Sequence, residues 1–175
     1  MTRRVLLSWS SGKDSAWALH RLVREDDVAV VGLLTTFNES ADRVAMHAVR
    51  RELVEAQAAA TRVPLWPVLL PWPCSNAEYE SRMDAALARA MIAGGLRAVL
   101  TCVDPRQLPG AYAGRLFDDE LLATLPSGVD PCGERGEFHT FCFAGPMFTS
   151  PIAVEVGERS LRDGFCFADV RPATT

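Results

Sequence analysis

The sequence predicts an α/β fold: a Rossmann-like, mostly parallel sheet with flanking helices, followed by a smaller C-terminal part rich in β structure. Three observations predict it. Short apolar runs alternate with helical patterns through residues 5–103, as in parallel α/β sheets. A loop of small polar residues joins the first apolar run to a helix. After Val103 the alternation stops, and short strand patterns separated by turns follow.

Four strands are expected in the first part, at residues 5–7, 28–34, 65–70 and 96–103, the last with its core at 98–103, all in one mostly parallel sheet. Pro67 places the third strand at a sheet edge, because proline donates no ladder hydrogen bond. Helices are expected directly after the loop, at residues 49–61, and from Ser75 to the Gly94–Gly95 pair. The last of these begins with the capping box Ser75-Asn76-Ala77-Glu78.

The second part begins with a Pro/Gly-rich loop at residues 104–110, followed by a short helix at 118–125. Strands are expected at residues 138–143, 152–156 and 165–170, with turns at Gly157 and at Asp163–Gly164 and a loose tail from Pro172 onward. We therefore expect two regions, an α/β region at 1–103 and a β-hairpin region at 104–175. The two regions are expected to pack as one unit.

Charge and cysteine usage narrow the class of protein. The 175 residues carry 18 basic and 22 acidic side chains, and no basic cluster indicates a nucleic-acid partner. The five cysteines are odd in number and form no C-x-x-C pair, so neither a disulfide framework nor a zinc site is indicated. No apolar run reaches membrane-spanning length. We expect a cytoplasmic protein with reduced thiols and no membrane partner.

The loop between the first strand and the first helix predicts a phosphate site. It consists of Ser10, Ser11, Gly12, Lys13, Asp14 and Ser15. Small residues let the backbone curl around phosphate oxygens at a helix N-terminus, where free N–H groups and the helix dipole favour an anion. Lys13 adds positive charge, and Asp14 beside a polyphosphate implies Mg²⁺. The alternative is a plain Ser/Gly turn with Ser15 as the N-cap.

A second polar cluster, residues 130–140, concentrates Glu134, Glu137 and His139 around Gly136, directly before a predicted strand. Since ligands of parallel sheets collect beyond the carboxyl ends of strands, this segment is a candidate for the second substrate's pocket. Glu137 and His139 are two residues apart, so an extended chain directs both side chains to one face. The alternative is a solvated turn whose charges pair with each other.

Together the two segments resemble known proteins over nearly the whole chain. The S-S-G-K-D-S loop is similar to the S-G-G-K-D-S loop of N-type ATP pyrophosphatases, PP-loop proteins with an adenine nucleotide alpha hydrolase-like fold. The segment D-P-C-G-E-R-G-E-F-H-T resembles the signature of the diphthine-ammonia ligase family. Shorter matches to that family include Met46-His47, Gly114-Arg115 and Arg162-Asp163-Gly164-Phe165.

Two departures from that family are visible. Ser11 stands where the family pattern usually has glycine, which predicts a slightly altered loop. A block with an extra Gly-Asp strand, a helix and a Pro-Leu-Trp segment is missing, and the join falls within residues 83–91. The strand at 98–103 therefore either moves beside the first strand or leaves an unpaired edge, which invites instability or self-association into a homo-oligomer. A further alternative is that the sequence omits residues of the protein.

The resemblance implies an adenylating ligase: a carboxylate attacks the α-phosphate of ATP, pyrophosphate leaves, and ammonia displaces AMP to form an amide. The acceptor is diphthine-like on a protein, or a small molecule. The loop residues would hold the ATP phosphates, with Lys13 catalytic and Asp14 on Mg²⁺, while Leu34 and Thr35 border the adenine. The resemblance thus makes residues 1–103 the nucleotide-binding region and residues 104–175 the substrate-site region. The remaining positions are expected around the acceptor and the amine, with Glu137 and His139 as catalytic groups: Asp104, Arg115, Glu134, Gly136, Glu137, His139 and Thr140. The alternatives are a non-catalytic adenine-nucleotide-binding protein and another PP-loop ligase.

Overall fold

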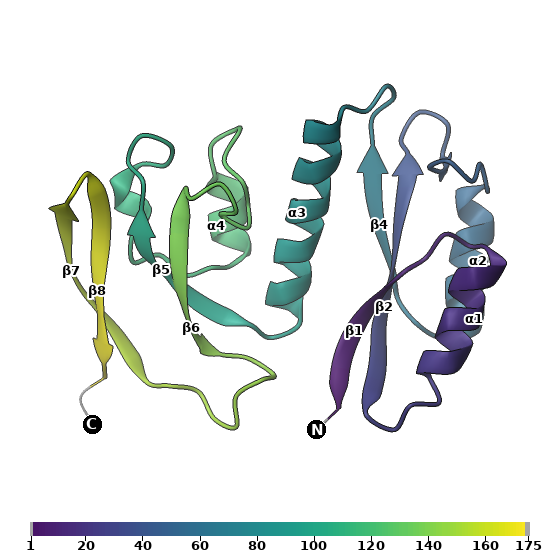
Figure 1. Ribbon diagram of the computed structural model, residues 1–175, viewed down its shortest axis with the longest axis horizontal. Helices are drawn as coiled ribbons and strands as arrows, with labels where there is room; N and C mark the ends of the chain where they lie inside the picture. Colours follow the sequence, from purple (N-terminus) through teal and green to yellow (C-terminus); the bar gives the residue numbers. More distant parts are fainter. Residues whose placement is uncertain (1, 174–175) are drawn as a thin grey trace. The chain divides into compact units, whose positions relative to one another are not determined.

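Three parallel strands form the core of the first sheet in the computed structural model, which describes residues 2–173 (Figure 1). The central strand β2 (Val28–Asn38) pairs in parallel with β1 (Arg3–Ser8) and with β4 (Leu65–Leu70). The short β3 (Arg43–Val44) adds an antiparallel pair at the end of β2. Among the described residues β4 pairs with β2 alone, so the edge position predicted from Pro67 is confirmed.

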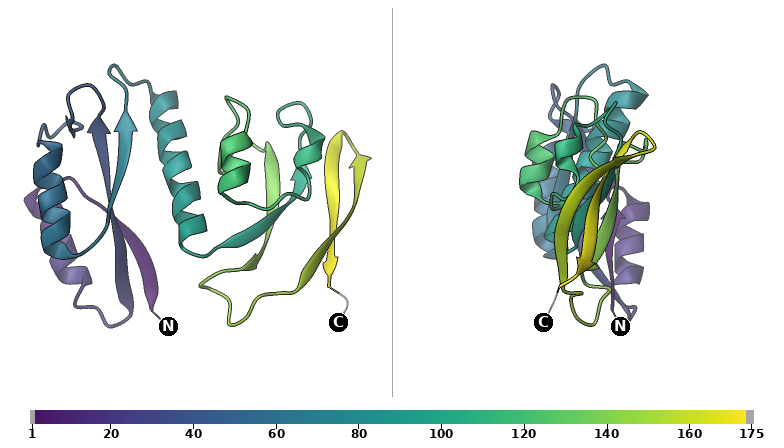
Figure 2. Two further views of the ribbon diagram at one scale, coloured as in Figure 1. Left: turned by 180° about the vertical axis from the view of Figure 1, so that it is seen from behind. Right: turned by 90° about the vertical axis from the view of Figure 1, so that its left-hand side faces the viewer.

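Two helices, α1 (Lys13–Leu22) and α2 (Arg51–Thr61), cover one face of this sheet, as both views of the chain show (Figures 1 and 2). Their buried residues meet those of the central strand in one apolar core, which includes Leu19, Leu33, Phe37, Val54 and Ala58. Leu33, Phe37 and Val54 have no exposed surface. β2 supplies Leu33 and Phe37 to this core and pairs with both β1 and β4, so it is the central strand of the sheet.

The long helix α3 (Asn76–Ala93) begins at the predicted capping box. The Glu78 carboxylate accepts hydrogen bonds from the Ser75 backbone N–H and hydroxyl, and the Ser75 hydroxyl oxygen accepts from the Glu78 N–H. These bonds lower the pKa of Glu78 below its usual value. The helix ends directly before Gly94–Gly95, as predicted.

The second sheet is antiparallel and has the order β6-β5-β8-β7. Its strands are β5 (Arg97–Val103), β6 (Phe138–Ala144), β7 (Val154–Arg162) and β8 (Phe165–Pro172). The prediction that residues 98–103 form a fourth strand of the parallel sheet is wrong: β5 pairs with β6 and β8 instead. The antiparallel partners come from the C-terminal part, whose pairing with β5 the apolar pattern of one strand cannot reveal.

The core of this second sheet lies against residues of α3 and of two short helices, η1 (Gly110–Tyr112) and α4 (Asp119–Thr124). Leu100, Leu108 and Leu121 are its fully buried leucines. The α4 helix is capped by Asp118, whose side chain accepts from the Leu121 N–H at 2.8 Å.

Two details of the last strands differ from the sequence prediction. The turn expected at Gly157 is a register shift within β7, between Val156 and Arg159, so the strand continues past it. The tail expected from Pro172 begins later, since Pro172 is the last residue of β8; residues 174 and 175 lie outside the described part. The turn predicted at Asp163–Gly164 is present, with positive φ at both residues.

The chain divides into two compact units, Met1–Arg82 and Met83–Thr175. The functional division after Val103 stays a prediction; by packing, β5 belongs with the C-terminal strands. Within residues 2–173, no helix combines the length and apolar character that crossing a membrane requires.

Candidate functional site

The phosphate loop begins directly after Trp9, the residue that follows β1. The Trp9 backbone N–H donates to the Leu34 carbonyl at 2.7 Å, and the Thr35 hydroxyl donates to the Trp9 carbonyl at 2.8 Å. Trp9 is 3% exposed and Thr35 1%. Leu34 and Thr35, predicted to border the adenine, therefore lie beside the base of the loop, and the Thr35 hydroxyl is committed to holding it.

The loop itself is closed by its own hydroxyls. The Gly12 N–H donates to Ser10 Oγ at 3.4 Å, Ser10 Oγ lies 3.3 Å from Ser15 Oγ, and Ser15 Oγ donates to the Gly12 carbonyl at 3.0 Å. The N-cap of α1 is Gly12, and no side chain caps the helix within the described residues. The alternative of Ser15 as an ordinary N-cap is thus wrong: the first turn is left open, as an anion site requires.

Ser11 departs from ordinary serine geometry. Its φ is +64°, in the left-handed region where glycine is favoured, so the serine adopts the backbone form that the family's usual glycine would take without strain. Its hydroxyl oxygen is buried, and among the residues described here it is the buried side-chain oxygen or nitrogen that lacks a hydrogen-bond partner. An unpartnered buried hydroxyl beside an open helix N-terminus fits a donor waiting for a phosphate oxygen.

Lys13 and Asp14 point into solvent and pair with each other. Lys13 Nζ lies 2.7 Å and 2.9 Å from the two Asp14 carboxylate oxygens, and the two side chains are 88% and 89% exposed. Such an exposed pair contributes little to stability and is free to rearrange around a ligand. Lys13 is also the sole lysine of the chain, since the other 17 of its 18 basic residues are arginines. The lysine supplies a compact, mobile point charge that the arginine fork does not.

The donor set around Asp14 limits how a metal ion would be held. No group of three or more His, Cys, Asp or Glu side chains that could hold a metal ion occurs in the described part of the chain. One carboxylate together with nucleotide phosphates is, however, an ordinary coordination set for Mg²⁺. The residues therefore fit a metal that arrives with the nucleotide.

The second cluster is built on two buried carboxylates. Asp104 directly follows β5, is 3% exposed, and accepts from the Arg106 backbone N–H and guanidinium and from the Gln107 amide at 2.8–3.1 Å. The Arg106 bonds hold the pKa of Asp104 well below its usual range. The Asp104 N–H donates to the Glu137 carbonyl at 2.9 Å, which ties the end of β5 to the loop before β6.

Glu137 folds back into its own loop. It is 1% exposed, and its two oxygens accept from the Asp130 N–H at 2.9 Å and the Arg135 N–H at 3.0 Å. His139 is exposed, so the prediction that Glu137 and His139 share a face is wrong. The reason is that β6 begins only at Phe138, and the chain before it turns through Gly136 with a φ of +79°.

The remaining predicted residues divide by exposure. Glu134, His139 and Thr140 are exposed around this loop. Arg115 is engaged elsewhere: its guanidinium donates to the Thr124 hydroxyl at 2.9 Å, at the end of α4, and lies over the Tyr112 ring at 4.9 Å. Through these contacts Arg115 supports the end of α4, and its expected place around the acceptor stays a prediction.

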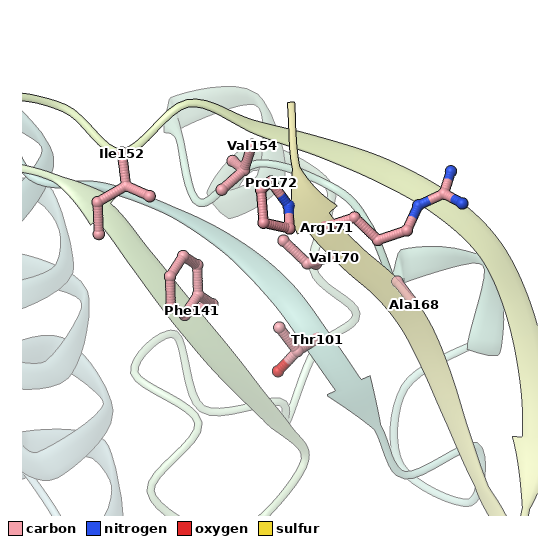
Figure 3. A pocket seen from close by; sticks show the side chains of 8 residues that line it. All are labelled: Thr101, Phe141, Ile152, Val154, Ala168, Val170, Arg171 and Pro172. Atoms are coloured by element: carbon pink, nitrogen blue, oxygen red, sulfur yellow. The ribbon is translucent and has the colours of Figure 1, made fainter. Parts of the chain in front are cut away.

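The structure thus places the predicted residues other than Arg115 in two clusters, one in each unit. Neither cluster contributes to the cavity of about 310 Å³ on the second sheet, whose lining is mostly apolar (Figure 3). Sequence reasoning missed Trp9 and Gln57, which shape the loop, and Asp130, whose carboxylate accepts from the Cys132 N–H at 2.7 Å. Only the position of Trp9, directly before the serines, signalled a role.

A parallel sheet whose first strand leads through a serine-rich loop into an uncapped helix defines a PP-loop type of α/β protein. Comparison with known families agrees. Residues 3–94 match the diphthamide synthase N-terminal domain, and residues 84–174 match the diphthamide synthase C-terminal domain. The chain belongs to the diphthamide synthase family. The two matches overlap at residues 84–94, which cover the end of α3 and most of the segment where the sequence predicts the join.

Curated relatives support the same family. The chain is 32% identical to the diphthine–ammonia ligase of Danio rerio over 122 residues, which is 67% of this chain and 45% of the relative. It is 29% identical to that of Rattus norvegicus over 122 residues, 67% of this chain and 43% of the relative. The chain therefore spans less than half the length of the curated relatives it matches.

Proposed function

We propose that the chain is an ATP-dependent, amide-forming ligase of the diphthine–ammonia type, which cleaves ATP to AMP and pyrophosphate. The observation that carries the proposal is the open N-terminus of α1, with the buried and unpartnered Ser11 hydroxyl beside it. Family membership and the names of the relatives support the reaction class.

In this proposal the loop holds the β- and γ-phosphates. Ser10, Ser11, Gly12 and Ser15 surround the anion, and Lys13 exchanges its pairing with Asp14 for the phosphates, where it stabilises charge on the departing pyrophosphate. Asp14 is then free to ligate Mg²⁺, which neutralises phosphate charge when bound. Leu34 and Thr35 lie close enough to the loop's base to border the adenine.

The second cluster is proposed to receive the carboxylate acceptor and ammonia. The exposed carboxylate of Glu134 is available to hold ammonium, and the exposed imidazole of His139 to take a proton from it, with Thr140 beside them. Since both oxygens of Glu137 accept backbone N–H groups, we assign it the positioning of this loop and not substrate contact. Asp104 supports the same loop from the end of β5, and Gly136 provides its turn. The acceptor is diphthine-like or a small carboxylate.

The test is to incubate the protein with ATP, Mg²⁺, ammonium and candidate carboxylate acceptors, diphthine included, and to identify the nucleotide products. Formation of AMP and pyrophosphate is expected, and ADP would refute the assignment. Lys13→Ala should abolish product formation. Arg21→Ala, which removes a cation from the last turn of the same helix, should not. Equal turnover by both variants would show that the loop assignment is wrong.

A second candidate is an adenine-nucleotide-binding protein that ligates nothing. One sequence feature favours it: loss of the internal block that is expected to be missing within residues 83–91 would remove part of a second substrate's pocket. The single lysine distinguishes the two candidates cleanly. Reductive ¹³C-methylation gives one ε-amine NMR signal, and its shift on adding ATP reports binding at Lys13 independently of any product. Binding without AMP under all acceptors would favour this second function.

A further inference from the structure

A side chain outside the predicted site, Gln57 of α2, joins two ends of the phosphate loop. Its carboxamide oxygen accepts from the Trp9 indole N–H at 3.1 Å, and its NH₂ group donates to the Ser11 carbonyl at 3.2 Å. Both bonds span more than forty residues of sequence and are partly buried. Through these two hydrogen bonds, Gln57 connects α2 to the phosphate loop.

The chemistry of the two partners requires a residue that both donates and accepts. An indole N–H can only donate and a backbone carbonyl can only accept, so a single amide orientation satisfies both. Asparagine is one methylene shorter, glutamate has no donor when ionised, and leucine has neither group. Of the uncharged side chains of this length, glutamine alone supplies both.

The second bond falls on the residue whose backbone is strained. Ser11 has a φ of +64°, a conformation that costs an L-residue free energy and that persists only when its surroundings enforce it. Before Ser11 in the chain, Trp9 is held by hydrogen bonds to Leu34 and Thr35. After it, Gly12 is the N-cap of α1. The Gln57 amide donates a hydrogen bond to the Ser11 carbonyl between these two restrained residues. This bond opposes relaxation of Ser11 to negative φ.

We propose that Gln57 is a positioning residue of the nucleotide site: it holds Ser11 in the left-handed conformation and thereby keeps the loop in the form that accepts the ATP phosphates. We call this restraint of Ser11 by Gln57 the clamp. This inference rests on the proposed phosphate-binding role of the loop. It explains how the chain tolerates serine at this position. The backbone form that glycine adopts freely is imposed here by a hydrogen bond from α2.

The first test compares Gln57→Leu with Glu52→Leu, an equally drastic change on the exposed face of the same helix, where the side chain is 72% exposed. The dissociation constant for Mg·ATP is measured through the ¹³C-methyl signal of Lys13. Loss of one hydrogen bond that maintains the binding form weakens ATP roughly fivefold in Gln57→Leu, and Glu52→Leu leaves it unchanged. Unaltered affinity in Gln57→Leu would overturn the proposal.

The decisive test is rescue. Ser11→Gly makes the left-handed conformation accessible without strain, so removing Gln57 should then matter less, about twofold or under. A merely structural role of Gln57 predicts the same loss of affinity in both backgrounds, and that result would refute the clamp. Gln57→Glu separates the two bonds, because the indole partner is retained while the donor to Ser11 is lost; its ATP affinity should fall as in Gln57→Leu.

One readout requires no nucleotide. The indole N–H resonance of Trp9, assigned with Trp9→Phe, should be retained in Gln57→Glu and should shift upfield in Gln57→Leu. If the wild-type protein binds no ATP, the proposed function fails, but the Trp9 resonance and the free energies of unfolding of the Ser11/Gln57 double-mutant cycle still test the clamp. If the wild-type protein binds ATP and the cycle shows no coupling, the clamp alone fails.

Discussion

Glu137 offers the sharpest test of how the second cluster is built. The substitutions are Glu137→Gln, which keeps the shape and replaces one acceptor by a donor, and Glu137→Ala, which removes both acceptors. The matched control is Glu134→Gln, in the same loop but exposed. If Glu137 positions the loop through its two backbone hydrogen bonds, the first two variants lose stability and the control does not.

The magnitude follows from the contacts. Hydrogen bonds to a charged acceptor contribute about 1.5–3 kcal/mol each, and a buried donor left without a partner adds its own cost. In Glu137→Gln the new NH₂ group faces one of the two N–H donors, so about 2–3 kcal/mol of the free energy of unfolding should be lost. Glu137→Ala strands both N–H groups and leaves a cavity at a residue that is 1% exposed, which raises the loss to about 4 kcal/mol.

The chain provides separate probes for its two units. All four tryptophans, at positions 9, 17, 66 and 72, lie in Met1–Arg82, whereas four of the five cysteines lie in Met83–Thr175: Cys102, Cys132, Cys142 and Cys166. Urea titrations followed by alkylation of these thiols should show the second unit unfolding earlier in both Glu137 variants, with unchanged tryptophan fluorescence transitions. Equal thiol exposure in Glu137→Gln and wild type would refute the reasoning, and lost turnover at full stability would assign Glu137 to substrate contact.

Three further predictions concern the same unit. Gly133→Ala should cost about 1–3 kcal/mol in urea titrations, because Gly133 has a φ of +73° and an added Cβ would lie 2.9 Å from the Phe138 carbonyl oxygen. Gly128→Ala, where nothing lies within 4 Å, should cost less, and equal losses would contradict the steric argument. The lowered pKa of Asp104 means that its ionised form stabilises the fold above pH 3.8 and that this stabilisation is lost as the pH falls further. Asp104→Asn should therefore flatten the pH dependence of the free energy of unfolding below pH 3.8. An unchanged slope would show that the ionised Asp104 paired with Arg106 does not stabilise the fold. Burial, followed by nearby carboxylates, raises the pKa of Cys132 from 9.0 to about 11, so the unit should lose stability as the pH rises between these values. Cys132→Ala should lessen that loss, and the same loss in both proteins would mean that other groups cause it.

Local signals made the first cluster predictable. The loop, the helix that follows it and the capping box at Ser75 are each specified by neighbouring residues, and each is found where the sequence places it. The clamp by Gln57 was not predictable, because its partners lie 46 and 48 residues away and a glutamine in a helix is usually only a surface residue. The sequence showed that Ser11 stands where the family usually has glycine. It did not show that Ser11 adopts the left-handed backbone conformation.

The second cluster was predictable in composition but not in its division of labour. Spacing alone made Glu137 and His139 equivalent, whereas hydrogen bonding separates a buried carboxylate that organises the loop from exposed groups that face outward. Strand pairing was the least predictable feature. The apolar pattern of residues 98–103 suits either sheet, and only the partners β6 and β8 decide between them.

The pairing of β5 also shows which neighbours the phosphate loop needs. Since β5 does not join the first sheet, β1 has β2 as its only strand partner among the described residues, which is the unpaired edge expected if the missing block is absent. Yet the groups outside the loop that hold it come from Leu34 and Thr35 of β2 and from Gln57 of α2. None of the three comes from the open side of β1. The phosphate loop therefore depends on neighbours within residues 34–57, and the nucleotide-binding step of the proposed reaction does not need a strand beside the free edge of β1.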